Sequence, residues 1–306
     1  MVAQQTLLTG GTGFAGRVLV RRLAASGRPV RLLVRRPDPD AGVPVHCVTD
    51  WSDEAALRGA MEGVDAVCHL AGLAHLTGRA PADEDQRFDA VNVGLSCRVA
   101  QAAFAAGVRR FVFVSSIGAV ATSTRPGEAL NEQSPCRPTT PYGRSKLRAE
   151  ARLREIADAH HAELVVVRPP LVHGRNAPGN LARLAKLVAT GLPLPLAGIA
   201  NQRSLIHVDN LARVLELCLD HPAAAGETFH VRDLHDYSTP DILRGLARAM
   251  GRPPRMFGLP MPVLRWLAGA AGQRETFGQL TGWLQVDDAH VRALLGFVPA
   301  EVEFAA

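Results

Sequence analysis

Short apolar runs and longer amphipathic stretches alternate through the first half of the chain. The runs are rich in Val, Leu and Phe, and the stretches between most of them have helical length and spacing. The expected strands are Gln5–Thr9, Val30–Val34, Val45–Val48, Ala66–Leu70, Arg110–Ser115 and Leu164–Val167, and the expected helices are Gly16–Ala25, Asp53–Glu62, Asp83–Ala106 and Gly143–His161. Because parallel neighbours need a crossover, this α/β pattern predicts a doubly wound parallel sheet with helices on both faces.

The pattern changes after Pro169, where prolines and glycines become denser and helical spacing less regular. We therefore expect two units, a sheet domain over residues 1–168 and a smaller mixed lobe over residues 169–306. The late run Glu227–Val231 has the character of a strand. We expect it, with the segment of about 203–232, to return to the main domain.

Composition narrows the class of protein. Apolar residues make up 47% of the 306 residues and charged residues 21%, an ordinary globular balance. No apolar run is long enough for a membrane helix, and the first strand starts close to Met1, so we expect a cytoplasmic protein with no membrane partner. The five cysteines show no CxxC and no metal-ligand spacing, which predicts reduced thiols and no metal.

The net charge of +5 points to no polymeric partner. Of the 34 basic residues only Lys146 and Lys186 are lysine, and the arginines are spread along the chain. No basic run with interleaved aromatic residues suggests nucleic acid. The arginines are read either as a solvated surface or as a basic face for phosphorylated small molecules.

A glycine-rich turn follows the first expected strand. Thr9–Gly16 satisfies G-x-G-x-x-G and leads directly into an expected helix. Glycines there permit a tight turn and let backbone N–H groups approach a pyrophosphate at the helix N-terminus. The sequence therefore predicts a dinucleotide site. Its expected contacts are Gly10, Gly13, Phe14, Ala15 and Gly16.

The second expected strand ends in Arg35 and Arg36. A fold that prefers NAD usually places an acidic residue near here, where it holds the ribose 2′-hydroxyl. Arginine can instead pair with a 2′-phosphate. The sequence thus favours NADP over NAD, unless these are simply two surface arginines.

Tyr142 and Lys146 form a second candidate for chemistry. The chain has two tyrosines and two lysines, and this pair has the i, i+4 spacing that places two side chains on one helix face. A neighbouring ammonium would lower the phenol pKa toward that of a working general acid or base. Ser115 and Ser116 end the fifth expected strand, and we favour Ser116 as the group that holds a reacting oxygen.

Together these landmarks resemble the extended short-chain dehydrogenase/reductase superfamily, whose members are nucleotide-sugar epimerases, dehydratases and reductases on a Rossmann-type fold. Further matching stretches are His69–Gly72, Asn92-Val93, Arg168-Pro169, Gly179–Leu181 and Arg203–Asp209. The resemblance implies a catalytic triad of Ser116, Tyr142 and Lys146. Further implied cofactor contacts are Arg35, Arg36, Asp50, Trp51, Leu70, Ala71, Gly72, Asn92, Tyr142, Lys146 and Pro169.

The resemblance also implies a UDP-sugar substrate and a homodimer. Asn180 and Leu181 would contact the diphosphate, and Arg203 would pair with a phosphate. The second lobe is similar to a bacterial subgroup in surface-polysaccharide synthesis, through Gly191–Leu196 and Gly282–Asp287. Two departures matter. Ser116-Ile117-Gly118 replaces the Thr-Asp-Glu of dehydratases, and Leu171 stands where an Asn is common.

Four functions follow from this reading. The first is NADP-dependent reduction at C4 of a UDP-4-keto-6-deoxy-N-acetylhexosamine. The second is UDP-glucose or UDP-N-acetylglucosamine 4-epimerisation with tightly bound NAD. A non-enzymatic NADP sensor and a reductase of small carbonyl compounds complete the set; the Tyr142–Lys146 pair argues against the sensor, and Asn180 and Arg203 argue against the small-carbonyl reductase.

Overall fold

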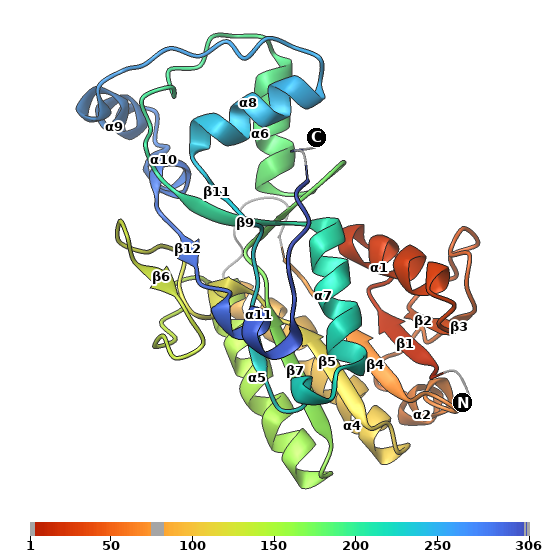
Figure 1. The fold of residues 1–306 in the computed structure, drawn as a ribbon. Helices are drawn as coiled ribbons and strands as arrows, with labels where there is room; N and C mark the ends of the chain where they lie inside the picture. Colours follow the sequence, from red (N-terminus) through yellow and green to blue (C-terminus); the bar gives the residue numbers. More distant parts are fainter. Residues whose placement is uncertain (1–3, 75–82, 303, 305–306) are drawn as a thin grey trace.

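A seven-stranded parallel sheet forms the centre of the protein in a computed structural model that describes residues 4–74, 83–302 and 304. The strand order is β10-β7-β5-β4-β1-β2-β3 (Figure 1). The strands are β1 Thr6–Thr9, β2 Val30–Val34, β3 Val45–Cys47, β4 Ala66–His69, β5 Arg110–Val114, β7 Glu163–Arg168 and β10 Thr228–His230. The predicted Rossmann-type fold is confirmed.

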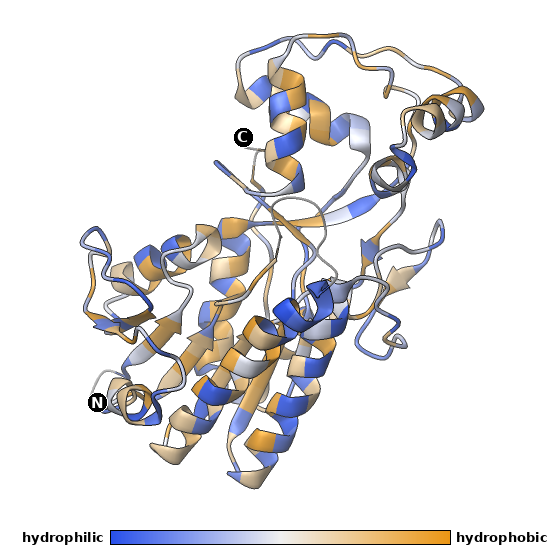
Figure 2. Cartoon of the chain, turned by 180° about the vertical axis from the view of Figure 1, so that it is seen from behind, coloured by the Kyte–Doolittle hydropathy of each residue, from blue (hydrophilic) through white to orange (hydrophobic). Residues whose placement is uncertain are grey.

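Helices cover both faces of this sheet because its strands are apolar on both sides. Leu8 packs in the cluster with α1 and α7, and its neighbour Leu7 packs in the opposite cluster with α2, α4 and α5. Figure 2 shows the apolar strands enclosed between two-toned helices. These helices are α1 Phe14–Ala25, α2 Glu54–Ala60, α4 Ser96–Ala105, α5 Pro141–Ala159, α7 Val208–Asp220 and α11 Ala289–Leu295.

The helix expected over 83–106 is interrupted by a wider turn. It consists of α3 Glu84–Asp89, a π-helical turn η1 at Ala90–Leu95, and α4. The sequence pattern does not register the π turn, because it adds a residue to one turn without interrupting the apolar face. Such turns commonly occur at functional positions.

The second part of the chain forms smaller layers above the sheet. β8 Leu171–His173 pairs parallel with β9 Arg203–His207, and β11 Asp236–Tyr237 pairs antiparallel with β9. A short parallel pair joins β12 Gln285–Val286 to β6 Ala129–Leu130. The remaining helices are α6 Asn180–Ala189, α8 Thr239–Ala249, α9 Met261–Ala270 and α10 Arg274–Thr281, with 3-10 turns η2 Ile117–Ala119 and η3 Pro222–Ala224.

The chain returns to the main sheet after β9. α7 packs against α1, and β10 pairs with β7 at the edge of the sheet. β9 itself belongs to the upper three-stranded sheet. The expected strand at Glu227–Val231 is thus present as β10 at Thr228–His230.

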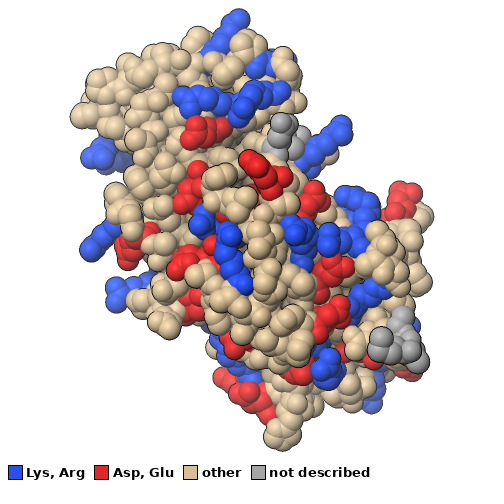
Figure 3. All heavy atoms as spheres, viewed as in Figure 1, with Lys and Arg blue, Asp and Glu red and all other residues tan. Residues whose placement is uncertain are grey.

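Acidic and basic side chains intermingle over the sheet domain, whereas the upper part of the view is mostly uncharged or basic (Figure 3). Within the described ranges, no helix combines the length and apolarity that crossing a bilayer requires.

Candidate active site

The glycine turn between β1 and α1 is shaped by close backbone approaches. Gly10 has φ +70°, and a Cβ there would lie 2.6 Å from the Ala71 nitrogen. A Cβ at Gly16 would lie 2.1 Å from the Gly10 oxygen, to which the Gly13 N–H donates at 3.0 Å. Side chains at these positions would fill the turn, so the residues present fit a bound pyrophosphate at the N-terminus of α1.

The first residues of α1 place this N-terminus at the turn. Phe14 and Ala15 open the helix, and their N–H groups belong to its first turn, where backbone donors have no partner within the helix. The Arg17 side chain donates to the Thr12 oxygen at 2.9 Å and pairs with Asp38 at 3.1 Å. Sequence reasoning missed this clamp, which joins the glycine turn to the segment after β2.

Arg35 and Arg36 follow β2 directly, and both are exposed. Their position at the carboxyl end of β2 suits an adenosine ribose contact.

Asp50 and Trp51 follow β3 at the same edge of the sheet. Asp50 accepts hydrogen bonds from the Ser52 hydroxyl and N–H at 2.7 and 2.8 Å, which lower the pKa of its carboxyl. Trp51 packs partly buried against the apolar cluster that contains α2.

The loop after β4 connects the glycine turn to the tyrosine–lysine helix. Leu70 and Ala71 donate their N–H groups to the Thr9 carbonyl at 3.1 Å and hydroxyl at 3.3 Å. A Cβ at Gly72 would lie 3.1 Å from Asn92 Oδ1 and 3.2 Å from Lys146 Nζ. A series of close approaches thus leads from the glycine turn to Lys146.

Asn92 lies in the π turn η1 and is completely buried. Its side chain accepts from the Leu73 N–H at 2.8 Å and donates to the Leu73 carbonyl at 3.0 Å and the Ser145 hydroxyl at 2.9 Å. Ser145 in turn donates to the Tyr142 carbonyl at 2.8 Å. The Asn92 side chain therefore connects the loop after β4 to the first turn of α5, which carries Tyr142.

Helix α5 begins beside the fifth strand. Thr140 caps it by accepting the Gly143 N–H at 3.1 Å, and Pro141 occupies the first helical position. A Cβ at Gly143 would lie 2.2 Å from the Gly118 oxygen. This close approach brings Tyr142 next to the turn that holds Ser116.

Lys146 is 4% exposed, and its Nζ donates to the Val114 carbonyl at 2.9 Å and lies 4.7 Å from the centre of the Phe113 ring. Burial lowers the pKa of its ammonium to about 8, while the Glu150 carboxylate opposes that shift. The lysine is therefore a buried cation whose charge changes close to neutral pH.

The Tyr142 phenol differs from the sequence-based expectation. Burial raises its pKa above the ordinary value, and the neighbouring Ser116 hydroxyl lowers it. The expected lowering of the phenol pKa by Lys146 is not found in the protein alone, where burial and the Ser116 hydrogen bond are the two influences. Any lowering would depend on a further charge at the site, such as a bound nicotinamide.

The two serines after β5 have different surroundings. Ser115 is buried and donates to Glu150 at 2.5 Å, and Glu150 forms a two-bond ion pair with Arg168 at 2.9 and 2.6 Å. Ser116 is only partly buried, and its Oγ accepts the Gly118 N–H at 3.0 Å beside the Tyr142 ring. Ser116 is thus the serine that lies beside the phenol, and its predicted role in holding a reacting oxygen stays a prediction.

Pro169 supports the same turn from β7. Its carbonyl accepts the Ile117 N–H at 2.9 Å, while the Ser115 N–H donates to Val167 at 2.8 Å. The carboxyl ends of β5 and β7 are therefore tied together directly beneath Ser116.

In the sequence, His69 stands out only as the first residue of the matching stretch His69–Gly72. Its ring contacts the Thr9 hydroxyl at 2.8 Å and the Ser96 hydroxyl at 3.0 Å, and the ring is completely buried. Burial, together with the Lys146 charge, lowers the pKa of the imidazole to about 3. It is therefore a neutral side chain that connects β1, β4 and α4 through its two hydrogen bonds.

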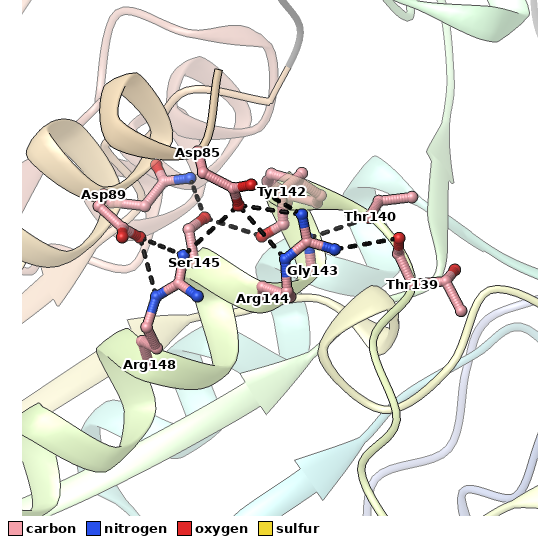
Figure 4. Close-up of polar contacts among 10 residues, drawn as sticks. Asp85, Asp89, Thr139, Thr140, Tyr142, Gly143, Arg144, Ser145 and Arg148 are labelled. Carbon is pink, nitrogen blue, oxygen red and sulfur yellow. Dashed lines mark hydrogen bonds and ion pairs between the residues drawn. The ribbon is translucent and has the colours of Figure 1, made fainter. Parts of the chain in front are cut away.

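Ion pairs fasten α3 to α5 on the outside of the site (Figure 4). Arg144 makes a two-bond contact to Asp85 at 2.9 and 3.0 Å, and Arg148 pairs with Asp89 at 2.6 Å. All four side chains are partly exposed, so these pairs orient the helices more than they stabilise them.

The expected substrate residues lie in the upper layers. Asn180 is exposed at the start of α6, whereas Leu181 is 2% exposed and packs with Leu205 and Ile242. Only the backbone of Leu181 could therefore meet a ligand. Arg203 begins β9, and its Nη1 donates to the carbonyls of Gln279 at 2.6 Å and Gly282 at 3.2 Å.

Sequence reasoning thus missed the residues that hold the site together, among them Ser145, Glu150 and Arg17. Two weak signals point to them: Ser145 is adjacent to Lys146, and Glu150 follows Lys146 by one further helical turn. Their partners are far apart in the chain, so only the fold reveals the contacts.

Comparison with known proteins agrees with this geometry. Residues 6–231 match the model of the NAD dependent epimerase/dehydratase family. A protein of Vibrio cholerae called UDP-glucose 4-epimerase is 34% identical over 298 residues, which cover 96% of this chain and 90% of that protein. A ceramide reductase of Caulobacter vibrioides is 33% identical over 263 residues, covering 83% and 73%.

Among solved structures, a short-chain dehydrogenase/reductase superfamily protein from Agrobacterium tumefaciens with bound NAD has a TM-score of 0.74 and 26% identity. The match covers 98% of this chain and 94% of that one. The chain therefore belongs to the NAD-dependent epimerase/dehydratase family of the extended short-chain dehydrogenase/reductase superfamily.

Proposed function

We propose that the protein is a nicotinamide-dependent oxidoreductase acting at C4 of a UDP-activated sugar. The observation that carries the proposal is the series of contacts from Gly10 through Ala71 and Gly72 to Lys146, with Tyr142 and Ser116 next along the same edge. A phenol beside a dinucleotide turn suits proton transfer at a carbon where a hydroxyl and a ketone interconvert.

Each catalytic side chain has a separate task in this proposal. Ser116 donates a hydrogen bond to the reacting C4 oxygen and Tyr142 takes or returns its proton. Lys146 supplies positive charge near the phenol. A bound nicotinamide would accept or deliver the hydride. The partly buried Ser116 and the raised pKa of Tyr142 favour a phenol that is protonated when substrate arrives.

The upper layers would hold the rest of the substrate. Arg203 would pair with a phosphate of the nucleotide, and the start of α6 at Asn180 and Leu181 would face the diphosphate. The Arg203 guanidinium uses Nη1 for two carbonyls, which leaves its other N–H groups to donate elsewhere. The name of the Vibrio cholerae relative supports a UDP-sugar.

Within this class, 4-epimerisation is the leading candidate. It is supported by the Vibrio cholerae relative, which aligns along nearly the whole chain. An epimerase removes and returns one hydride, so it consumes no cofactor. This reverses the order that the sequence alone suggested.

Reduction of a UDP-4-keto-6-deoxy-N-acetylhexosamine is the second candidate. It is favoured by Arg35 and Arg36, which lie exposed at the end of β2 where a 2′-phosphate of NADP could be bound. A reductase must exchange its cofactor at every turnover, and NADPH is a common reductant. The double variant Arg35→Ser, Arg36→Ser would weaken NADP binding but not NAD binding if this candidate holds.

A substrate panel separates the two. The purified protein is incubated with UDP-glucose, UDP-N-acetylglucosamine or the 4-keto-6-deoxy sugar, each with NAD or NADPH. Inversion at C4 without net cofactor change supports the epimerase, and NADPH oxidation with only the keto sugar supports the reductase. No turnover of any of these, with UDP also failing to raise the melting temperature, would contradict the UDP-sugar proposal.

We also propose a homodimer through the surface of α4 and α5. Both helices cover one face of the main sheet and present their outer sides to solvent in a single chain. Light scattering during size-exclusion chromatography tests this proposal. A single-chain mass at every concentration would contradict it.

A further inference from the structure

Helix α9 presents its apolar side to solvent. Val263, Trp266 and Leu267 have the i, i+3, i+4 spacing of one helix face, and their exposed fractions are 42%, 70% and 43%. Leu264, on another side of the helix, is buried at 4%. The helix thus has more apolar surface than its packing against the protein uses.

Further exposed apolar side chains lie in the segments that precede α9 in the chain. Phe257 is 47% exposed, and Leu192 is 63% exposed on a segment that pairs with the Phe257 segment through the Leu194–Met256 and Leu196–Gly258 bridges. Of the eight large apolar side chains exposed among the described residues, six lie in residues 187–267. We call Val263, Trp266 and Leu267 the α9 patch.

A groove borders the α9 patch. It lies between α9 and α10, has a volume of about 740 Å³, and is lined by Trp266 and Phe277 together with Arg265 and Arg274. Aromatic rings and guanidinium groups therefore share one concave surface. This combination suits a ligand surface that offers apolar chains beneath anionic groups.

The charge of this part of the chain is uneven. Residues 171–206 and 236–286, here called the small lobe, hold ten basic and three acidic residues, whereas the rest of the chain holds 24 basic and 26 acidic residues. The positive charge of the protein is thus concentrated in the small lobe, and two of its arginines, Arg265 and Arg274, line the groove beside α9. In Figure 3 the upper face is largely uncharged, with basic side chains at its margins.

We propose that the α9 patch binds the surface of an anionic lipid bilayer. Trp266, Val263 and Leu267 would enter the boundary between headgroups and acyl chains, while Arg265 and Arg274 would contact lipid phosphates. With ten residues, α9 is too short to cross a bilayer and would lie in its plane. The proposal departs from the sequence-based expectation of no membrane partner, and it does not depend on the proposed reaction.

The positive charge of the small lobe argues against a second copy of the chain as the partner of the α9 patch. A two-fold contact through the α9 patch would bring two small lobes together, each with a large excess of arginine. Like charges would then face one another across a small apolar contact. An anionic bilayer complements both features of the surface.

Vesicle sedimentation with the full chain tests the proposal. We expect binding to vesicles of phosphatidylglycerol and phosphatidylcholine, little binding to phosphatidylcholine alone, and loss of binding as salt rises. The variant Trp266→Ser, Leu267→Ser should weaken binding at least about tenfold. Arg265→Glu, Arg274→Glu should weaken it on the anionic vesicles while leaving the apolar face intact.

The matched control is Val298→Ser, which removes a side chain of 60% exposure outside the small lobe. It should bind like the unchanged protein. Trp266 also provides a spectroscopic signature, because vesicles should shift its emission to the blue and Trp266→Phe should bind without that shift. Melting temperatures show that the variants are folded.

Three results would overturn the proposal. One is failure to bind anionic vesicles. Another is binding that the Trp266→Ser, Leu267→Ser variant leaves unchanged. The third is a dimer in solution that this variant dissociates, with no vesicle binding, which would assign the α9 patch to self-association.

Discussion

The candidate site at the carboxyl ends of the main-sheet strands, here called the sheet edge, differs in construction from the small lobe. At the sheet edge, Asn92, Lys146 and Glu150 are almost fully buried, and each has polar partners within 3.0 Å. In the small lobe, Asn180 is exposed and α9 turns apolar side chains outward. The contrast is between a closely packed candidate site with satisfied polar groups and a lobe that leaves polar and apolar side chains open to solvent.

The largest effect on stability should come from the buried ion pair. Glu150→Gln leaves Arg168 charged and uncompensated at 4% exposure, which should cost about 3–5 kcal/mol in the free energy of unfolding. Urea denaturation measures this loss. Glu155→Gln, on the same helix in an exposed pair with Arg152, is the control and should leave stability unchanged. Equal effects of the two variants would show that the sheet edge is no more rigidly held than the surface.

The glycine turn offers a test by a single methyl group. In Gly16→Ala the new Cβ would meet the Gly10 oxygen at 2.1 Å, so the turn must shift and NAD binding should weaken at least about a hundredfold. Gly59→Ala is the matched control, because a Cβ in α2 there meets nothing within 4 Å. Calorimetric titration with NAD compares them. Unchanged affinity in Gly16→Ala would contradict the cofactor site.

Lys146 predicts a pH dependence. Its ammonium has a pKa of about 8 in the protein alone, so the positive charge is lost as pH rises through that value. If the charge assists catalysis, kcat/KM should fall up to about tenfold per pH unit above pH 8. Lys146→Met should lower the rate and remove this limb, whereas Lys186→Met, on the exposed face of α6, should not.

The same group predicts the direction of a stability change. Because the folded pKa is below the ordinary 10.5, the unfolded chain binds more protons between these values. The free energy of unfolding should therefore increase as pH rises from about 8 toward 10.5, because the buried side chain loses its proton before the unfolded one does. This gain is lost again as pH falls through 8. Urea midpoints of the unchanged protein and of Lys146→Met across this range measure it, and parallel curves would contradict it.

The small lobe should show smaller effects, seen in substrate binding and in the internal hydrogen bonds that Arg203 donates to Gln279 and Gly282. If Arg203 pairs with a substrate phosphate as proposed, Arg203→Met removes that charged contact, so KM for the UDP-sugar should rise about tenfold with kcat nearly unchanged. Arg203→Lys keeps the charge and should lie between. Arg183→Met, an exposed change on α6, is the control. An unchanged KM in Arg203→Met would remove Arg203 from the binding site.

The sequence was sufficient for the strands of the main sheet, the glycine turn and the placement of Tyr142 and Lys146 on one helix, because apolar runs and i, i+4 spacing are local signals. It was not sufficient for the π turn that carries Asn92, or for the pairing of Glu150 with Arg168, because these depend on contacts between distant segments. The outward face of α9 was also hidden, since an apolar stripe at helical spacing normally predicts a buried face.

The central claim is that the Tyr142 phenol transfers the substrate proton. Tyr142→Phe removes only the hydroxyl, and the Phe88 ring can still pack edge-on against it. We predict that kcat falls about 10²–10⁴-fold with NAD affinity unchanged, while Tyr237→Phe, a matched change at the other tyrosine, stays near the original rate. Turnover by Tyr142→Phe at the rate of Tyr237→Phe would contradict the claim.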